Sequence, residues 1–239
     1  MERACALAAD TLRHLQPYVQ RGTTTLQLDT IAFEFITKNN AYPSPLHYKG
    51  YPASICTSVN NVMCHGIPNN RALADGDLVN IDVTVFLDGM HGDTSRTFLV
   101  SPQTGTSLAK ALLQVTERAM MAGISVCRHG VSFSQIAIEI ERVVADSRYP
   151  FTVSPDFCGH GIGSLFHAYP CISHTLQGAT EGHMTAGMVF TVEPIVCHGS
   201  SEYRIWEDGW TAVSKDGGLS AQFEHTVLIE ADGFRILTL

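Results

Sequence analysis

Two aspartates, Asp82 and Asp93, have a spacing that points to chemistry. They lie in two apolar segments joined by Asp88-Gly89, a dipeptide typical of a two-residue hairpin turn. With that turn, Thr84 faces Asp93 across the hairpin, and Asp82 is a diagonal neighbour of Asp93 on the same face. Two carboxylates held together among apolar residues repel each other, so either one is protonated or a cation lies between them. The alternative is that Asp82 lies on a solvent-exposed face of the hairpin.

Two further acids and one histidine extend this pattern. Glu193 and Glu224 each stand alone in an apolar segment, and His160 lies between two glycines that allow another group to approach closely. Taken singly, such a glutamate usually lies at a sheet edge, and such a histidine is usually bonded to the backbone. Together, four carboxylates and one histidine match the ligands of two divalent ions and do not suit copper or a thiolate zinc site. On these residues alone, a general di-metal hydrolase such as a phosphoesterase also fits.

The elements that hold these side chains can be predicted from hydrophobic spacing and turn residues. Thr24 and Gln27 form a capping box at the start of the second helix. Each half of the chain gives two helices, a His-Gly-Ile loop and strands that carry acids, which predicts two similar α+β halves around a cleft. The expected helices cover 1–20, 24–39, 106–122 and 132–146. The expected strands cover 78–87, 90–100, 187–197, 204–213 around an Asp208-Gly209 turn, and 221–230. Residues 42–45 are expected as loop or extended chain, and the Gly-rich stretch 158–163 as a loop.

Composition limits the classes of function. The 239 residues are expected to form one domain, 1–239, and the formal net charge of −8 excludes an electrostatic grip on nucleic acid or an anionic membrane. No apolar run reaches the roughly 18 residues of a membrane span, and the N-terminus has no signal or transit pattern. The seven cysteines are scattered without a Cys-x-x-Cys pair, so all are expected as free thiols in a reducing compartment, the cytoplasm or the mitochondrial matrix.

Six short segments stand out together, in this order along the chain: Cys64-His65-Gly66-Ile67-Pro68, Asn80-Ile81-Asp82-Val83, His91-Gly92-Asp93-Thr94-Ser95, Gly159-His160-Gly161-Ile162-Gly163, Thr191-Val192-Glu193-Pro194 and Gln222-Phe223-Glu224-His225-Thr226. They closely resemble the type 1 methionine aminopeptidases of peptidase family M24, from about Thr24 onward. The resemblance implies the pita-bread fold, a curved antiparallel sheet with helices outside and an internal pseudo-two-fold. The 42–45 segment is most similar to the organellar forms of these enzymes.

The resemblance also implies a ligand set and its ions. Asp82 is implied as the bidentate ligand of one ion, Asp93 and Glu224 as bridging carboxylates, and His160 and Glu193 as ligands of the other ion. The implied cofactors are two divalent ions of cobalt, manganese, iron(II) or zinc. A sodium or potassium ion is implied at a separate site formed by Asn60, the backbone oxygen of Val62, and Ser220.

The activity implied by the resemblance is removal of an N-terminal methionine when the second residue is small. A hydroxide held between the two ions would attack the carbonyl carbon that follows the methionine. Glu193 would pass the proton to the leaving amine, His167 would hydrogen-bond the scissile amide, and His65 would lie near the substrate backbone. The methionine pocket implied by position consists of Tyr48, Tyr51, Cys56, Phe166 and Trp210.

Two rival hypotheses share the fold, and the first of them also shares this ligand set. An Xaa-Pro aminopeptidase or prolidase would need an additional N-terminal domain, for which there is no room before Thr24. A non-catalytic binding module would be expected to lose ligands, and this chain keeps all five. The expected partners are nascent polypeptide N-termini that begin with Met, and the ribosome, with no direct nucleic-acid or membrane partner; a monomer is expected. The histidines without an expected role, assigned to the surface or to loops, are His14, His47, His129, His174, His183 and His198.

Overall fold

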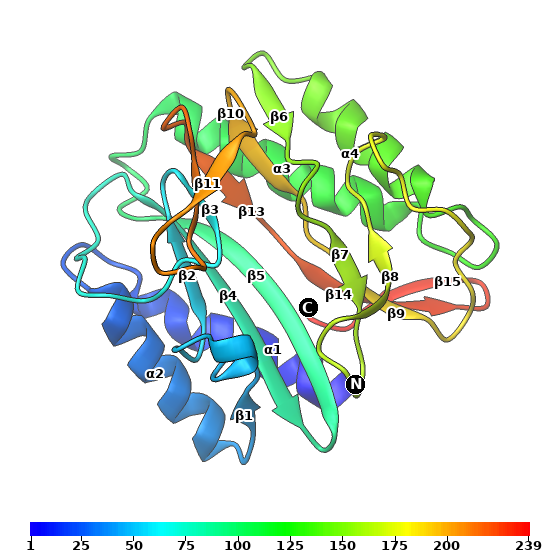
Figure 1. Ribbon diagram of the computed structural model, residues 1–239, viewed down its shortest axis with the longest axis horizontal. Coiled ribbons are helices and arrows are strands. Elements are labelled where there is room, and N and C mark those ends of the chain that lie inside the picture. Colours follow the sequence, from blue (N-terminus) through cyan, green and yellow to red (C-terminus); the bar gives the residue numbers. More distant parts are fainter.

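The computed structural model describes all residues, Met1–Leu239, and consists of two halves that each carry a pair of helices on the outside of strands (Figure 1). The helices are α1 Glu2–Leu15, α2 Thr25–Lys38, α3 Ser107–Ser125 and α4 Ser134–Ala145, with short 3-10 turns η1 Gln16–Tyr18 and η2 Tyr48–Gly50. The strands of the first half are β1 Tyr42–Pro43, β2 Cys56–Val59, β3 Val62–Cys64, β4 Leu78–Leu87 and β5 Met90–Leu99. Those of the second half are β6 Phe151–Val153, β7 Gly159–Gly161, β8 Ala168–Ile172, β9 Val189–Val192, β10 Ile195–His198, β11 Tyr203–Ile205, β12 Ala212–Ser214, β13 Ser220–Gln222, β14 His225–Glu230 and β15 Gly233–Ile236.

The β4–β5 hairpin organises the first half. Its register is the one that the Asp88-Gly89 turn predicts, with Thr84 opposite Asp93. One face of β4 is apolar and packs with α1 and α2 into a buried core, so the alternate face, which carries Asp82 and Thr84, points away from these helices. The predicted capping box is confirmed, because the Thr24 and Gln27 side chains each accept a hydrogen bond from the other's backbone N–H.

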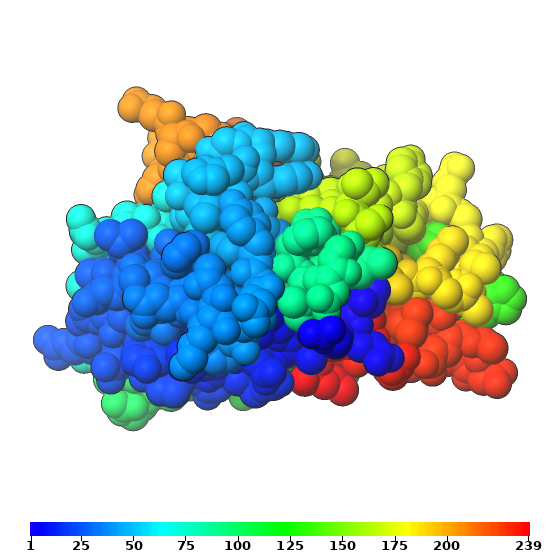
Figure 2. All heavy atoms as spheres, turned by 90° about the horizontal axis from the view of Figure 1, so that it is seen from below, coloured from blue at the N-terminus to red at the C-terminus, as the bar shows by residue number.

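Helix α1 lies directly against the hairpin at Gly92. A Cβ atom at this position would overlap the backbone of Ala4 and Cys5, so only glycine allows the helix and β5 to approach this closely. The start of α1 also lies beside the C-terminal strands in Figure 2, where dark blue and red segments adjoin. Glu2 and Arg235 form an ion pair across this junction. The two ends of the chain therefore lie in contact.

The second half contains a five-stranded sheet, in the order β15-β14-β9-β7-β8, and a three-stranded sheet, β13-β10-β6. Helices α3 and α4 pack against both sheets around a larger apolar core that includes Phe190, Val192 and Val196. No helix is long and apolar enough to cross a lipid bilayer.

The predicted strands 187–197 and 221–230 are each broken in the middle. Glu193 lies between β9 and β10, and Glu224 lies between β13 and β14. Strand β9 pairs with β14 and β10 pairs with β13, so both segments leave one sheet and enter the other at the same level. Pro194 contributes to the first break, since it has no N–H to donate to a ladder. The two glutamates therefore lie at the seam between the sheets.

The prediction that all seven cysteines are free thiols is wrong for two of them. Cys158 and Cys171 form a disulfide, with Cα atoms 6.1 Å apart, and the other five cysteines are free and buried. No Cys-x-x-Cys pair marks these two residues, because they are 13 positions apart and become neighbours only when β7 and β8 pair. The expected loop at 158–163 accordingly contains strand β7.

Candidate active site

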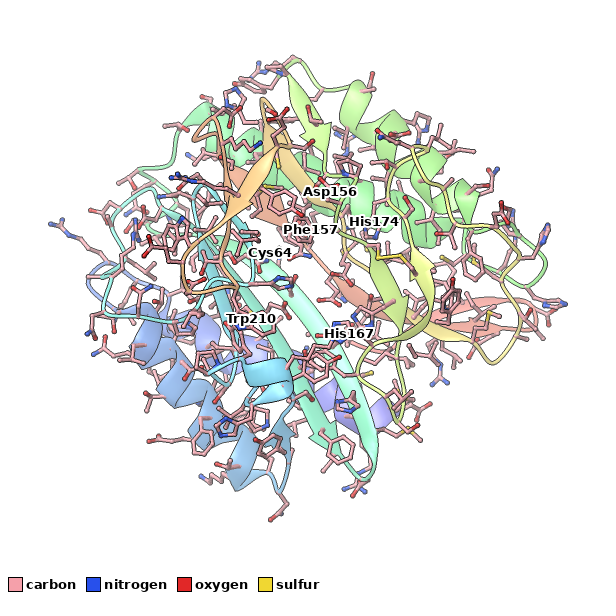
Figure 3. All side chains as sticks on the ribbon, in the orientation of Figure 1. Cys64, Asp156, Phe157, His167, His174 and Trp210 are labelled. Carbon is pink, nitrogen blue, oxygen red and sulfur yellow. A yellow bond between two sulfur atoms is a disulfide. The ribbon has the colours of Figure 1, made fainter.

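A cavity of about 380 Å³ lies between the two halves of the protein. It is lined by all five predicted metal ligands and by every residue that the resemblance assigns to catalysis or to the methionine pocket. In Figure 3, Trp210 and His167 lie on opposite sides of it, with Phe157 and Asp156 above them in the view. The lining residues are Pro45, Tyr48, Lys49, Tyr51, Cys56, Cys64, His65, Asp82, Thr84, Asp93, Asp156, Phe157, Cys158, His160, Phe166, His167, Glu193, Ile195, Trp210, Gln222 and Glu224.

The acidic side chains converge on the His160 imidazole. Ligand atoms of Asp93, His160 and Glu224 all lie within 4.8 Å of one another. The Nε2 atom of His160 is 3.6 Å from Oδ2 of Asp93 and 3.7 Å from Oε1 of Glu193. Asp82 enters the same cavity from the central part of β4. These distances leave space for a cation between the donors, at the 2.0–2.2 Å or so that metal ligands prefer.

The cluster contains more acidic groups than one histidine can neutralise, and this shifts the pKa values of its members. Burial, and then the neighbouring carboxylates, hold the pKa of both Asp82 and Glu224 well above the usual range. Burial raises the pKa of Glu193 to about 7, although His160 and hydrogen bonds oppose the shift. The pKa of His160 rises to about 9, because Asp93 and Glu193 outweigh the effect of its burial. One imidazolium cannot balance four carboxylates, so the donor set fits divalent cations.

Two side chains with no predicted role orient Glu193. Thr191, which is fully buried, donates a hydrogen bond to Oε1 of Glu193 at 2.6 Å. The same hydroxyl accepts the backbone N–H of His160 at 2.9 Å. Gln222 donates to Oε2 of Glu193 at 3.2 Å. Their positions two residues before Glu193 and Glu224 were the available signal, because side chains two apart share a strand face.

Thr84 has the same function for Asp93. Its hydroxyl donates to Oδ1 of Asp93 at 2.6 Å across the hairpin. This contact follows directly from the predicted register.

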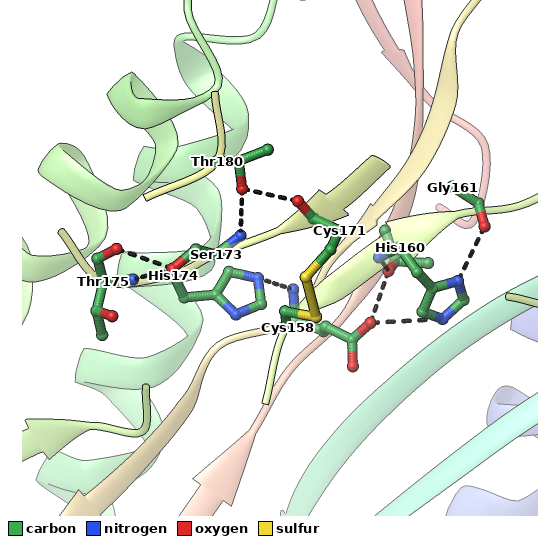
Figure 4. The surroundings of a disulfide bond; sticks show 10 residues. Cys158, His160, Gly161, Cys171, Ser173, His174, Thr175 and Thr180 are labelled. Atoms are coloured by element: carbon green, nitrogen blue, oxygen red, sulfur yellow. Dashed lines mark hydrogen bonds and ion pairs between the residues drawn. A yellow bond between two sulfur atoms is a disulfide. The ribbon is translucent and has the colours of Figure 1, made fainter. Parts of the chain in front are cut away.

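His174 lies in the loop after β8, one of the two places expected for it, but the expectation that it has no role is wrong. The side chain is almost completely buried, and its Nε2 accepts the backbone N–H of Glu193 at 3.1 Å (Figure 4). Burial lowers the pKa of His174 to about 3, so the imidazole is neutral and its Nε2 is free to accept. A lone histidine 19 residues before Glu193 carries no sequence signal for such a contact.

His167 lies over the metal-ligand cluster from the other side. Its ring centroid is 4.2 Å from that of His160, and its Nδ1 is 3.0 Å from the hydroxyl of Tyr48. Burial and the nearby His160 charge lower the pKa of His167 to about 4, so the ring is neutral at pH 7. Phe166 packs against both His167 and Tyr48.

The opposite wall is largely aromatic. The Trp210 ring is nearly perpendicular to the rings of Tyr51 and His65, with ring centroids 5.1 Å and 6.3 Å apart, respectively. Burial lowers the pKa of His65, so this imidazole is also kept neutral. Cys56 and Phe157 complete the wall; Phe157 was not predicted, and its ring meets that of His65 at 5.9 Å.

The three residues expected at a monovalent cation site also lie together, outside the cavity. The Ser220 hydroxyl donates to the backbone oxygens of Val62 at 3.0 Å and Asn60 at 3.3 Å. Two carbonyl oxygens and a hydroxyl thus converge where β13 approaches the turn between β2 and β3.

Comparison with known proteins agrees with this fold and site. Residues 1–231 match the model of metallopeptidase family M24, so the chain belongs to that family. Over 238 residues it is 47% identical to the mitochondrial methionine aminopeptidase 1D of Homo sapiens, covering 100% of this chain and 70% of that protein. The crystal structure of methionine aminopeptidase from Rickettsia prowazekii superposes with a TM-score of 0.95 at 45% identity, covering 100% of this chain and 95% of that one. Within family M24, the relationship is with the type 1 methionine aminopeptidases.

The expected pita-bread fold and enzyme class are therefore confirmed. The prolidase from Pyrococcus furiosus shares the fold, with a TM-score of 0.77 and coverage of 100% of this chain and 62% of that one, but at only 19% identity. This likeness shows the fold alone. It does not support the rival prolidase hypothesis against relatives more than twice as similar in sequence.

Proposed function

We propose that this metalloaminopeptidase releases the N-terminal methionine of polypeptides from the cavity described above, with Asp82, Asp93, His160, Glu193 and Glu224 holding two divalent ions. Bound there, the ions would lower the pKa of a water molecule towards neutrality and polarise the scissile carbonyl. The observation that carries this proposal is the convergence of four carboxylates, of which Asp93 and Glu224 are buried, on one imidazole, which leaves excess negative charge unless cations or protons bind. Manganese, cobalt, iron(II) and zinc all suit such a set.

The methionine side chain would occupy the aromatic part of the cavity. A volume of about 380 Å³ lies at the small end of ligand pockets and suits one side chain rather than a long segment. Tyr51, Cys56, Phe166 and Trp210 offer polarisable and aromatic contacts that favour a thioether. Burial raises the pKa of the Cys56 thiol well above its usual range, so it remains a neutral wall residue.

The two neutral histidines would orient the substrate. If the Tyr48 hydroxyl donates to Nδ1 of His167, the ring proton lies on Nε2 and can be donated to the substrate carbonyl. A neutral donor stabilises negative charge on that oxygen without repelling the metal ions. His65, next to Trp210, is the corresponding candidate for the peptide backbone.

Glu193 would transfer the proton. Its pKa of about 7 lets the carboxylate accept a proton and return it to the leaving amine near neutral pH. Thr191 and Gln222 hold its two oxygens in place while it does so.

The test is a comparison of three peptides with manganese or cobalt, followed by mass spectrometry. We expect free methionine from Met-Ala-Ser, no cleavage of Ala-Ala-Ser, and loss of activity with a chelator or in Glu193→Ala. Met-Arg peptides should react far more slowly than Met-Ala peptides, because the narrow cavity excludes bulk at the second position. Cleavage before proline regardless of the first residue would instead support the prolidase hypothesis, and folded protein inactive with every metal would support the binding module.

The wider setting is also part of the proposal. The enzyme would bind nascent chains that begin with Met as they emerge from the ribosome. It would act as a monomer in the cytoplasm or the mitochondrial matrix. A sodium or potassium ion at Asn60, Val62 and Ser220 would stabilise the turn beside β13. Sedimentation would test the monomer and its association with ribosomes, cell fractionation would test the compartment, and unfolding with and without sodium or potassium would test the ion site.

A further inference from the structure

The Cys158–Cys171 pair lies against the metal-ligand cluster (Figure 4). Cys158 lines the cavity and precedes His160 by two residues. Cys171 is the direct partner of His160 in the β7–β8 ladder. The disulfide therefore ties both strands together at the level of a proposed ligand.

The strand beyond Cys171 leads to a second ligand. The Thr180 hydroxyl donates to the Cys171 carbonyl at 2.7 Å and accepts the Ser173 N–H at 2.8 Å, which fixes the end of β8. His174 follows at once and accepts the backbone N–H of Glu193. A clamp at Cys171 thus restrains the segment that orients Glu193 as well as the one that carries His160.

The two sulfur-bearing residues differ in access to solvent. Cys171 is exposed and Cys158 is half-buried, whereas the remaining five cysteines are all buried. A reductant in solution can therefore reach this pair, through Cys171, and no other cysteine of the chain.

We propose that Cys158 and Cys171 form a reversible redox site through which dithiol reductants lower the metal affinity of the enzyme. A thiolate of the dithiol attacks Sγ of Cys171, the sulfur–sulfur bond breaks, and Cys158 leaves as a thiolate that takes up a proton. The second thiol of the dithiol then displaces Cys171, so the dithiol is oxidised to a disulfide and the protein pair gains two electrons and two protons. The effect on metal affinity rests on the proposed ligand set; the thiol chemistry does not.

The experiment equilibrates the full chain in buffers of reduced and oxidised dithiothreitol. Free thiols are counted by alkylation and mass spectrometry, and manganese affinity is measured by calorimetry in each state. We expect five free thiols after oxidation and seven after reduction, with manganese binding weaker by about tenfold in the reduced form, the range seen when the partners of metal ligands are lost.

Two variants separate the clamp from general thiol effects. Cys171→Ser should bind manganese as the reduced protein does in both buffers, while Cys127→Ala, a change far from the cavity, should keep the full redox response. Seven free thiols after oxidation of folded protein would overturn the proposal, and so would a redox response that persists in Cys171→Ser. Thiol counts and manganese affinity that change as expected, without methionine release in either state, would support the redox site and count against the proposed function.

Discussion

Removing the Thr191 hydroxyl tests, with a single substitution, how the chain orients two of its proposed ligands. The hydroxyl donates to Oε1 of Glu193 and accepts the His160 N–H, so one oxygen atom links two proposed ligands from different segments of the chain. Thr191→Val keeps the volume and the β-branched shape that suit β9 but removes that oxygen. The substitution leaves the His160 N–H buried without a partner and one carboxylate oxygen without its donor.

The expected magnitude follows from these two bonds. An orphaned buried N–H destabilises by about 1–3 kcal/mol, and a hydrogen bond to a charged carboxylate contributes about 1.5–3 kcal/mol. Loss of such orienting partners weakens metal binding by about 10–100-fold. The pKa of Glu193, raised mainly by burial, should rise further because the Thr191 bond lowers it. Protonated Glu193 cannot bind metal, so the defect should be larger at pH 7 than at pH 8.5.

The assay is manganese calorimetry at both pH values, beside urea unfolding of the metal-free protein. Thr191→Ser is the matched control, since it keeps the hydroxyl and loses only a methyl group. We expect near-native manganese affinity in the serine variant and the pH-dependent loss only in the valine variant. Native affinity in a folded Thr191→Val protein would refute the reasoning, and equal weakening in both variants would assign the effect to the methyl group.

Three further outcomes are expected. Gly92→Ala should lower the free energy of unfolding by about 1–3 kcal/mol in urea titrations, because its Cβ overlaps the backbone of α1, whereas Gly163→Ala, with open space around it, should not. Burial raises the pKa of Asp77, but hydrogen bonds from Arg71 and its neighbours outweigh burial and hold the pKa below the ordinary value of 3.8. The free energy of unfolding of the wild type should therefore fall as the pH drops through that value, and Arg71→Ala should show a shallower fall. Equal slopes in the two proteins would contradict this. Manganese at a hundred times its dissociation constant should stabilise the fold by about 2.7 kcal/mol in thermal melts, and a chelator should reverse this; an unchanged melting temperature would argue against specific binding.

Much of the site could be predicted because local rules determined it. The Asp88-Gly89 turn specifies the hairpin register, and the register alone brings Asp82 and Asp93 to one face. Alternation along β4 then requires that face to lie opposite the apolar one. The family resemblance supplied what the hairpin could not, namely that Glu193 and Glu224 meet the same cavity from the other half.

The features that were missed depend on contacts between distant segments. The breaks at Glu193 and Glu224 arise because two strands exchange sheets together, and an apolar run has the same appearance whether or not it changes partners. His174 and Glu193 are joined by tertiary packing alone, and the Cys158–Cys171 pair depends on the β7–β8 register. Composition and local spacing carry no record of such pairings.

The position of the site between the two halves has a consequence for the folding of the newly synthesised chain. Asp82 and Asp93 come from the first half, while His160, Glu193 and Glu224 come from the second, so no partial chain holds the full set of donors. A chain that ends before Glu224 lacks one of the proposed ligands, so the complete donor set forms only when both halves of the fold have come together.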